Sequence, residues 1–235
     1  MRTIWRYTQA RITGVNITRE HIQRARRYNA QAGVRDCDFL LNDFNSIDVS
    51  DNTFDAIYDF EATLHSTDRK RTFTELYRVL KPGCRLVSAQ YCLLDAYDDK
   101  NPEHRAIIRE IDNTNGCYCA GNTVASTTKA FQDAGFKIIR AFDAFEEMGD
   151  VPFHEVFVSK TGGRFFGTRA GRLFTKVALQ VGEFLRILPA GTVKVQEMLI
   201  GAAESFTEAG KRKLITPGYV FICEKPAGKE TATVA

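Results

Sequence analysis

Glu61 and His65 are the two side chains of this sequence whose types and spacing could move a proton. They stand four residues apart after a strand-like run, so a helix would present both on one face. In a cleft, a carboxyl and an imidazole can acquire pKa values near neutrality and can hydrogen-bond a substrate hydroxyl. The spacing alone favours the alternative, a surface ion pair. No Ser/His/Asp or Cys/His arrangement has a recognisable nucleophile context, which argues against covalent hydrolysis.

Polar residues also stand where two predicted strands end. The Asp43 carboxylate could accept a hydrogen bond from an exocyclic amine while Phe44 packs on a base; in the alternative, Asp43 caps its own turn with Asn42. Asn16 occupies the position where nucleotide-binding folds place a ribose-binding residue. Dinucleotide folds prefer Asp or Glu there and need an upstream Gly-x-Gly-x-x-Gly, which is absent, as is a P-loop. A nicotinamide-dependent dehydrogenase is therefore excluded.

Alternating strand-like and helix-like segments position these residues. The patterns predict helices over residues 19–32, 68–80 and 127–134, and strands over residues 13–17, 37–41, 54–58, 86–91 and 136–142. This order predicts an α/β fold with a mostly parallel sheet and helices on both faces. Ligands of such sheets bind beyond the carboxyl ends of the strands, which directs attention to positions 16, 43, 59–61 and 90–91.

The last third of the chain has a different character. Residues 148–216 are interpreted as an insertion or subdomain, after which a strand over residues 218–223 rejoins the sheet. The stretch over residues 162–191 alternates apolar residues with the cations Arg164, Arg169, Arg172 and Lys176. It could contact a hydrophobic ligand or a membrane interface, while ordinary core packing with solvated cations fits the pattern equally well. No run approaches the roughly 20 apolar residues that a spanning helix needs.

Composition narrows the class of protein further. With 235 residues, of which 44% are hydrophobic and 26% charged, the chain suits one soluble α/β domain or one domain plus a small appendage. A net charge of +3 is too mild to indicate nucleic-acid binding. Cys117 and Cys119 alternate in a polar loop with no matching ligand pair, so no metal site is predicted. The other four cysteines are predicted to be small core residues in a reducing, cytoplasmic compartment: Cys37, Cys84, Cys92 and Cys223.

Several motifs of the sequence occur in the same order as in a known family, and this order is more specific to the family than any single motif. The chain is similar to sterol methyltransferases of the type that methylates the sterol side chain with S-adenosylmethionine, from about Thr13 to Pro226. The similarity rests on residues 14–17, 42–44, 61–65, 80–83, 101–105 and 213–217. It implies a class I, Rossmann-like methyltransferase fold. Residues 1–147 would be a partial methyltransferase domain, 148–226 the C-terminal sterol methyltransferase region and 227–235 a polar tail.

The resemblance also implies roles for individual residues. Asn16 would lie near the adenosyl ribose of S-adenosylmethionine, and Asp43 and Phe44 around the adenine. Glu61 and His65 would lie at the rim of the active site, as candidates for the final deprotonation. Aromatic faces could stabilise the sterol carbocation, although core packing suits them equally: Tyr58, Phe60 and Tyr91.

The sequence departs from the family pattern at three places. The family's first strand, with its glycine-rich cofactor loop, would precede Met1; Gln90 stands where the family commonly has Glu; and residues 113–119 replace a glycine–aspartate loop. We therefore expect a truncated form or a degenerate paralogue with weak or absent cofactor binding. The expected partners are a sterol substrate, a second copy or a full-length paralogue, and peripheral contact with the endoplasmic reticulum membrane. The alternatives are a non-catalytic sterol- or lipid-binding module, or methylation of another small lipid.

Overall fold

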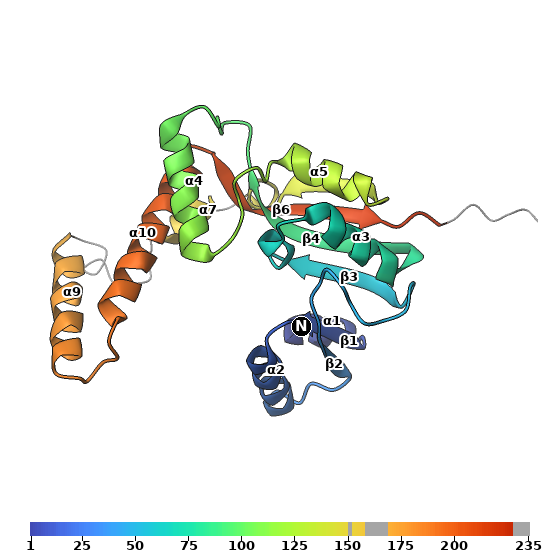
Figure 1. Cartoon of the computed structure of the whole chain (residues 1–235), viewed down its shortest axis with the longest axis horizontal. Coiled ribbons are helices and arrows are strands. Elements are labelled where there is room, and N and C mark those ends of the chain that lie inside the picture. Colours follow the sequence, from blue (N-terminus) through green and yellow to red (C-terminus); the bar gives the residue numbers. More distant parts are fainter. Residues whose placement is uncertain (150–151, 158–168, 228–235) are drawn as a thin grey trace, which may run out of the picture.

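The computed structural model describes residues 1–149, 152–157 and 169–227 (Figure 1). Its strands are β1 (Ile12–Asn16), β2 (Cys37–Leu41), β3 (Phe54–Phe60), β4 (Leu80–Leu93), β5 (Lys137–Asp143) and β6 (Ile215–Glu224). Its helices are α1 (Arg2–Thr8), α2 (Arg19–Gln31), α3 (Arg69–Val79), α4 (Pro102–Asn115), α5 (Val124–Asp133), α6 (Ala144–Met148), α7 (Phe153–Phe157), α9 (Arg169–Phe184) and α10 (Thr192–Lys211), with a 3₁₀ turn η1 at Thr63–His65. The predicted Arg164 and the tail from Gly228 lie outside the described residues.

The strands form two hydrogen-bonded sheets. β1 and β2 pair in parallel, with Asn16 opposite Leu41 at their carboxyl ends. The larger sheet has the order β3-β4-β6-β5, in which β3 and β4 are parallel and β6 runs antiparallel to both of its neighbours. The α/β prediction is confirmed, and the last strand does rejoin the sheet. The sheet is mixed, because the chain enters β6 from the opposite end after α10.

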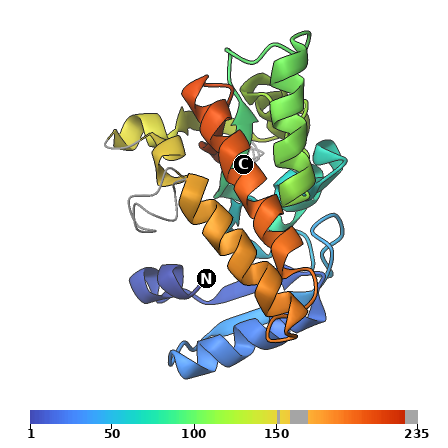
Figure 2. The same ribbon diagram turned by 90° about the vertical axis from the view of Figure 1, so that its left-hand side faces the viewer.

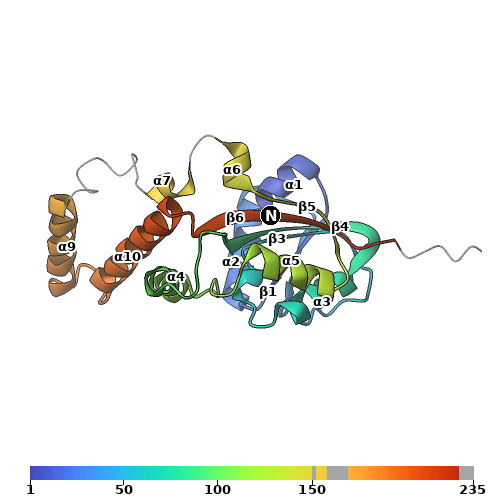
Figure 3. The same cartoon turned by 90° about the horizontal axis from the view of Figure 1, so that it is seen from above.

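The main core lies between the larger sheet and two of its helices. Figure 3 shows α3 and α5 along one face of the sheet and α6 on the other. Phe73 of α3 and Phe131 of α5 stack with ring centroids 3.9 Å apart, and Phe131 also contacts Phe221 of β6 at 5.4 Å. All three side chains are buried, so this aromatic cluster fixes both helices on the sheet.

A second core lies beyond the end of β4, where α4 packs against α10. Its buried residues come from η1, β4, α4, α7, α10, β6 and two of the loops beside them: Leu64, Leu93, Ile108, Ile111, Cys117, Cys119, Phe153, Phe206, Ala209, Leu214 and Ile215. Figure 1 shows α4 and α10 side by side at this end of the sheet, and Figure 2 shows α9 lying along α10. Lys176 of α9 pairs with Glu197 of α10 at 2.7 Å.

Candidate functional site

The turn after β3 carries Glu61 and His65. Glu61 adopts a left-handed backbone with φ 62°, and its amide donates to the carbonyl of Ala89 in β4 at 2.9 Å. Only the single 3₁₀ turn Thr63–His65 follows, so the regular helix assumed for this pair does not form. No ion pair joins Glu61 to His65 among the residues that the structure describes. Instead, His65 Nδ1 lies 2.8 Å from the carbonyl oxygen of Gly116, in the loop after α4.

Glu61 has a different partner, the Tyr91 side chain in β4. The Tyr91 hydroxyl interacts with the Glu61 carboxyl group and favours its charged form. Burial raises the pKa of Glu61 above its ordinary value, an effect that the Tyr91 hydroxyl and the charge of His65 partly oppose. Burial and the neighbouring Glu61 charge raise the pKa of Tyr91, so the phenol keeps its proton. The Tyr91 ring meets Phe206 of α10 edge-on at 5.8 Å.

Asp59 holds this turn in place from inside the protein. Its Oδ1 accepts hydrogen bonds from the amides of Ala62 and Thr63, at 3.0 and 3.2 Å. Its Oδ2 accepts from Thr63 Oγ1, Ser88 Oγ and Gln90 Nε2, at 2.6, 2.8 and 2.6 Å. Asp59 is only 6% exposed, so a carboxylate buried at the end of β3 organises the residues around Glu61. Sequence analysis drew attention to position 59 but did not predict that its carboxylate would hold the turn. The feature that could have indicated this role is an acidic residue within an otherwise apolar strand.

Asn16 and Asp43 form a second group at the ends of β1 and β2. The amide of Asn42 donates to the carbonyl of Asn16 at 3.2 Å, which brings the two strand ends together. Asn16 Oδ1 accepts from the Thr18 amide at 2.8 Å, and Asp43 Oδ1 accepts from the Asn45 amide at 2.8 Å. The local turn offered as the alternative for Asp43 is therefore present. Within the described parts of the chain, Asn16 Nδ2 and Asp43 Oδ2 form no hydrogen bond.

The predicted aromatic residues are divided between two places. Tyr58 and Phe60 alternate with Asp59 and therefore lie on the opposite face of β3, with ring centroids 5.5 Å apart. Tyr58 is half-buried, whereas Phe60 is 58% exposed. Tyr91 instead joins the Glu61 group. Phe44 is partly buried beside Asp43.

Comparison with known proteins shows to which family the chain belongs. A methyltransferase-domain family model matches residues 5–145, and a sterol methyltransferase C-terminal model matches residues 163–227. The chain is 34% identical to the cycloartenol-C-24-methyltransferase of Arabidopsis thaliana, over 96% of this chain and 68% of that protein. It belongs to the sterol methyltransferase family. The rice protein cycloartenol-C-24-methyltransferase 1 is 36% identical over 96% of this chain and 66% of its own length.

This member of the family spans about two thirds of the length of these plant relatives. Its fold is that of class I methyltransferases, as a solved structure shows. Geranyl diphosphate C-methyltransferase from Streptomyces coelicolor A3(2) superposes with a TM-score of 0.67 at 15% identity, covering 96% of this chain and 68% of that one. The predicted domain boundaries after residues 147 and 226 stay predictions.

Proposed function

We propose that this chain carries out methyl transfer from S-adenosylmethionine to a sterol, with a side-chain alkene carbon as the acceptor. Family membership supports the reaction class. The observation that carries the assignment of roles is the Glu61–Tyr91 pair, a carboxyl with a raised pKa beside a phenol that keeps its proton. It lies beyond the carboxyl end of β3, where sheets of this kind bind their ligands.

The ends of β1 and β2 fit the adenosine half of the cofactor. Asn16 Nδ2 is a donor suited to a ribose hydroxyl, and Asp43 Oδ2 is an acceptor suited to the adenine amine; both side chains are exposed. Phe44 offers an aromatic ring beside them. S-adenosylmethionine, when bound, supplies the methyl group from its sulfonium. We assign no residue within the described ranges to the methionyl half.

Glu61 is proposed to accept the proton that the sterol loses after methylation. Addition of a methyl group to an alkene leaves a carbocation, and loss of a neighbouring proton restores a double bond. A carboxylate with a raised pKa is a stronger base than an ordinary one, and the Tyr91 hydroxyl fixes its orientation. His65 would stand beside Glu61 as the second candidate for this step. The Tyr91 ring beside Glu61 could stabilise the cation by roughly 0.5–2 kcal/mol. The rings of Tyr58 and Phe60 lie on the other face of β3 from Asp59.

The C-terminal helices supply a surface suited to a lipid. Leu173, Val177, Val181 and Phe184 stand four, four and three residues apart on α9, and between 48% and 86% of each is exposed. This spacing makes an apolar stripe along α9 that suits contact with a lipid interface. Among the described helices, none combines the length and apolarity needed to cross a bilayer. We propose that the stripe rests on the surface of a sterol-containing membrane.

Transfer of a labelled methyl group to cycloartenol in vesicles tests the proposal. The unsubstituted chain and each variant are assayed with S-adenosylmethionine as the methyl donor. We expect Glu61→Gln to lower the rate about 100-fold or more, since general bases contribute 10²–10⁴-fold. The exposed carboxylate Glu20 on α2 provides the matched control, Glu20→Gln.

Two results would count against this assignment. Equal rates for Glu61→Gln and Glu20→Gln would remove the role of Glu61. Sterol binding without methyl transfer by the unsubstituted chain would instead establish the second candidate, a non-catalytic sterol-binding protein or regulatory partner of a full-length paralogue. The exposed stripe on α9 is the feature that favours this candidate.

A further inference from the structure

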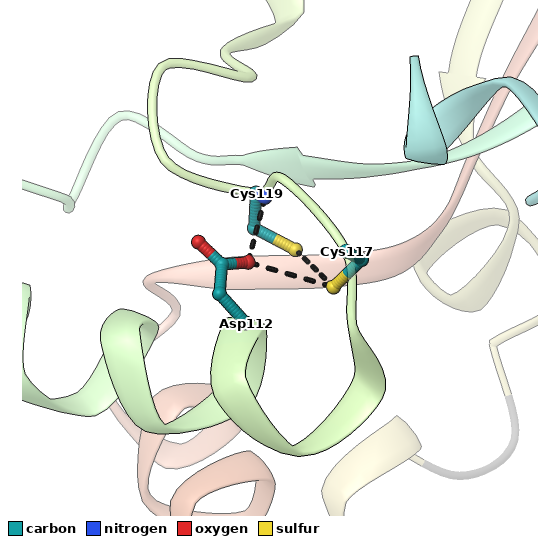
Figure 4. A group of neighbouring side chains, drawn as sticks. All are labelled: Asp112, Cys117 and Cys119. Atoms are coloured by element: carbon teal, nitrogen blue, oxygen red, sulfur yellow. Dashed lines mark hydrogen bonds between the residues drawn. The ribbon is translucent and has the colours of Figure 1, made fainter. Parts of the chain in front are cut away.

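Two cysteines and an aspartate meet at the end of α4. Asp112 lies in the last turns of the helix, while Cys117 and Cys119 come from the loop that follows it (Figure 4). The two thiols are 5% and 0% exposed, although the surrounding sequence is polar. The interpretation of this segment as a simple polar loop is therefore wrong for its cysteines, which belong to the second core.

The separations of these three groups match those around a tetrahedral zinc ion. The two Sγ atoms are 3.4 Å apart, and Cys117 Sγ lies 3.4 Å from Asp112 Oδ1. Bond lengths of about 2.3 Å to sulfur and 2.0 Å to oxygen at tetrahedral angles require about 3.8 Å between sulfurs and about 3.5 Å between sulfur and oxygen. The three ligand atoms all lie within 4.8 Å of one another. The sulfur–sulfur distance and the Cys117–Asp112 distance are each within a few tenths of an ångström of the required values.

The backbone around this cluster is already fixed in place. Asp112 Oδ1 and Oδ2 accept from the amides of Cys119 and Ala120, at 2.7 and 3.2 Å, which orients the carboxylate. Asn122, itself 2% exposed, binds the loop to β4: its side chain donates to the Tyr91 carbonyl, and its own carbonyl accepts from the Leu93 amide at 2.7 Å. A metal ion would therefore meet ligands that are already ordered.

We propose that Asp112, Cys117 and Cys119 bind a zinc-like divalent ion through two thiolates and one carboxylate. The two sulfur ligands favour borderline or soft ions over Mg²⁺ or Ca²⁺, which prefer oxygen. Three protein ligands leave a fourth position for water. Binding would release the two thiol protons, giving Zn²⁺, two thiolates and one carboxylate. The bound ion would also stabilise the loop whose Gly116 carbonyl contacts His65.

A disulfide between the two cysteines fits the geometry less well. It needs a sulfur–sulfur distance of about 2.05 Å, more than an ångström shorter than the observed 3.4 Å. The hydrogen bonds from Cys119 and Ala120 to Asp112 hold the intervening backbone against that contraction. The zinc proposal is independent of the methyl-transfer reaction, since none of its three ligands is assigned to that chemistry.

Titration of the reduced, metal-free chain with Co²⁺ tests the site directly. We expect one ion per chain with thiolate-to-cobalt charge-transfer absorption, displacement by Zn²⁺, and release of about two protons per ion. Cys117→Ser and Cys119→Ser should each weaken binding more than about 100-fold, since even loss of an outer partner of a metal ligand costs 10–100-fold. Cys37→Ser, at a half-buried thiol in β2, is the matched control and should leave binding unchanged.

A second measurement avoids substitutions that could unfold the chain. Saturating Zn²⁺ should slow iodoacetamide labelling of Cys117 and Cys119 in the unsubstituted chain at least about 10-fold, while labelling of Cys37 stays the same. Absence of charge-transfer absorption at saturating Co²⁺ would overturn the proposal. So would equal weakening by Cys37→Ser and Cys117→Ser, or a Cys117–Cys119 disulfide in a chain that binds no ion after reduction.

Discussion

Replacing Asp59 by Asn should destabilise the protein through a set of hydrogen bonds that can be counted. The amide oxygen of Asn can retain the bonds from the Ala62 and Thr63 amides. Its NH₂ group would then face Thr63 Oγ1, Ser88 Oγ and Gln90 Nε2, all of which now donate. The two hydroxyls can rotate to accept. Gln90 can flip its amide, because its buried Oε1 has no hydrogen-bond partner among the residues that the structure describes.

Asp59→Asn should therefore lower the free energy of unfolding because its hydrogen bonds are no longer made to a charged acceptor, and not because whole hydrogen bonds are lost. Bonds to a charged acceptor contribute about 1.5–3 kcal/mol and neutral ones about 1 kcal/mol, so with partial rearrangement we expect about 2 kcal/mol. Asp59→Ala instead leaves the backbone amides of Ala62 and Thr63 without an acceptor, at about 1–3 kcal/mol each. It also removes the acceptor of the Thr63 and Ser88 hydroxyls, whereas Gln90 Nε2 still donates to both hydroxyl oxygens. Asp59→Ala should cost roughly 3–6 kcal/mol, a large part of the total stability of a domain.

Urea unfolding followed by circular dichroism measures both effects. For Asp59→Asn the midpoint should fall with an unchanged slope, and Tm should fall by about 4–8 °C at 2–4 °C per kcal/mol. Asp55→Asn is the matched control on the same strand. Its side chain is 83% exposed and, within the described ranges, pairs only with Lys81, so the midpoint should move less than half as far. Equal shifts for the two variants would refute the role assigned to Asp59.

Two further predictions concern the surface of the C-terminal helices and the acid sensitivity of the fold. Val177→Ser combined with Val181→Ser should lower binding to sterol-containing vesicles about 10-fold in flotation assays, since burial in a lipid interface contributes about 0.8 kcal/mol per CH₂. An equal loss of binding from Ile139→Ser on β5 would contradict the proposed membrane role of α9. Hydrogen bonds from Arg78 hold the pKa of Glu75 below its ordinary 4.5, so their stabilisation is present above that pH and is lost as the pH falls below it. The urea midpoint of Glu75→Gln should therefore change less between pH 6 and pH 3 than that of the unsubstituted chain, and parallel pH profiles would contradict this assignment.

Local patterns in the sequence were sufficient for the strands, but among the described helices they predicted only α2, α3 and α5. The predicted strand over 37–41 is β2 as observed, and the predicted helix over 68–80 differs from α3 by one residue at each end. Both segments have hydrophobic patterns that the fold satisfies locally. Helix α4 was missed although Asn101 caps it, accepting from the Glu103 amide at 2.9 Å, and Pro102 begins it. These residues had been interpreted only as a family motif.

The site was harder to predict because its geometry depends on contacts between distant segments. The spacing of Glu61 and His65 suggested a helix, but Asp59 captures the two amides after Glu61. Spacing alone does not indicate the Glu61–Tyr91 interaction, which joins residues thirty positions apart. The burial of Cys117 similarly depends on a core built by α4 and α10, two helices that lie far apart in the sequence.

Tyr91 connects the two regions that the family models match. Its hydroxyl interacts with Glu61, within the methyltransferase domain, and its ring packs on Phe206 of α10, within the C-terminal region. The same second core contains Cys117 and Cys119, whose loop contacts His65 through Gly116. The position of the proposed base therefore depends on helices that follow it by more than a hundred residues. A shift of α10 would move the Phe206 ring on which Tyr91 packs, so the C-terminal region can affect the proposed methyl-transfer site through packing.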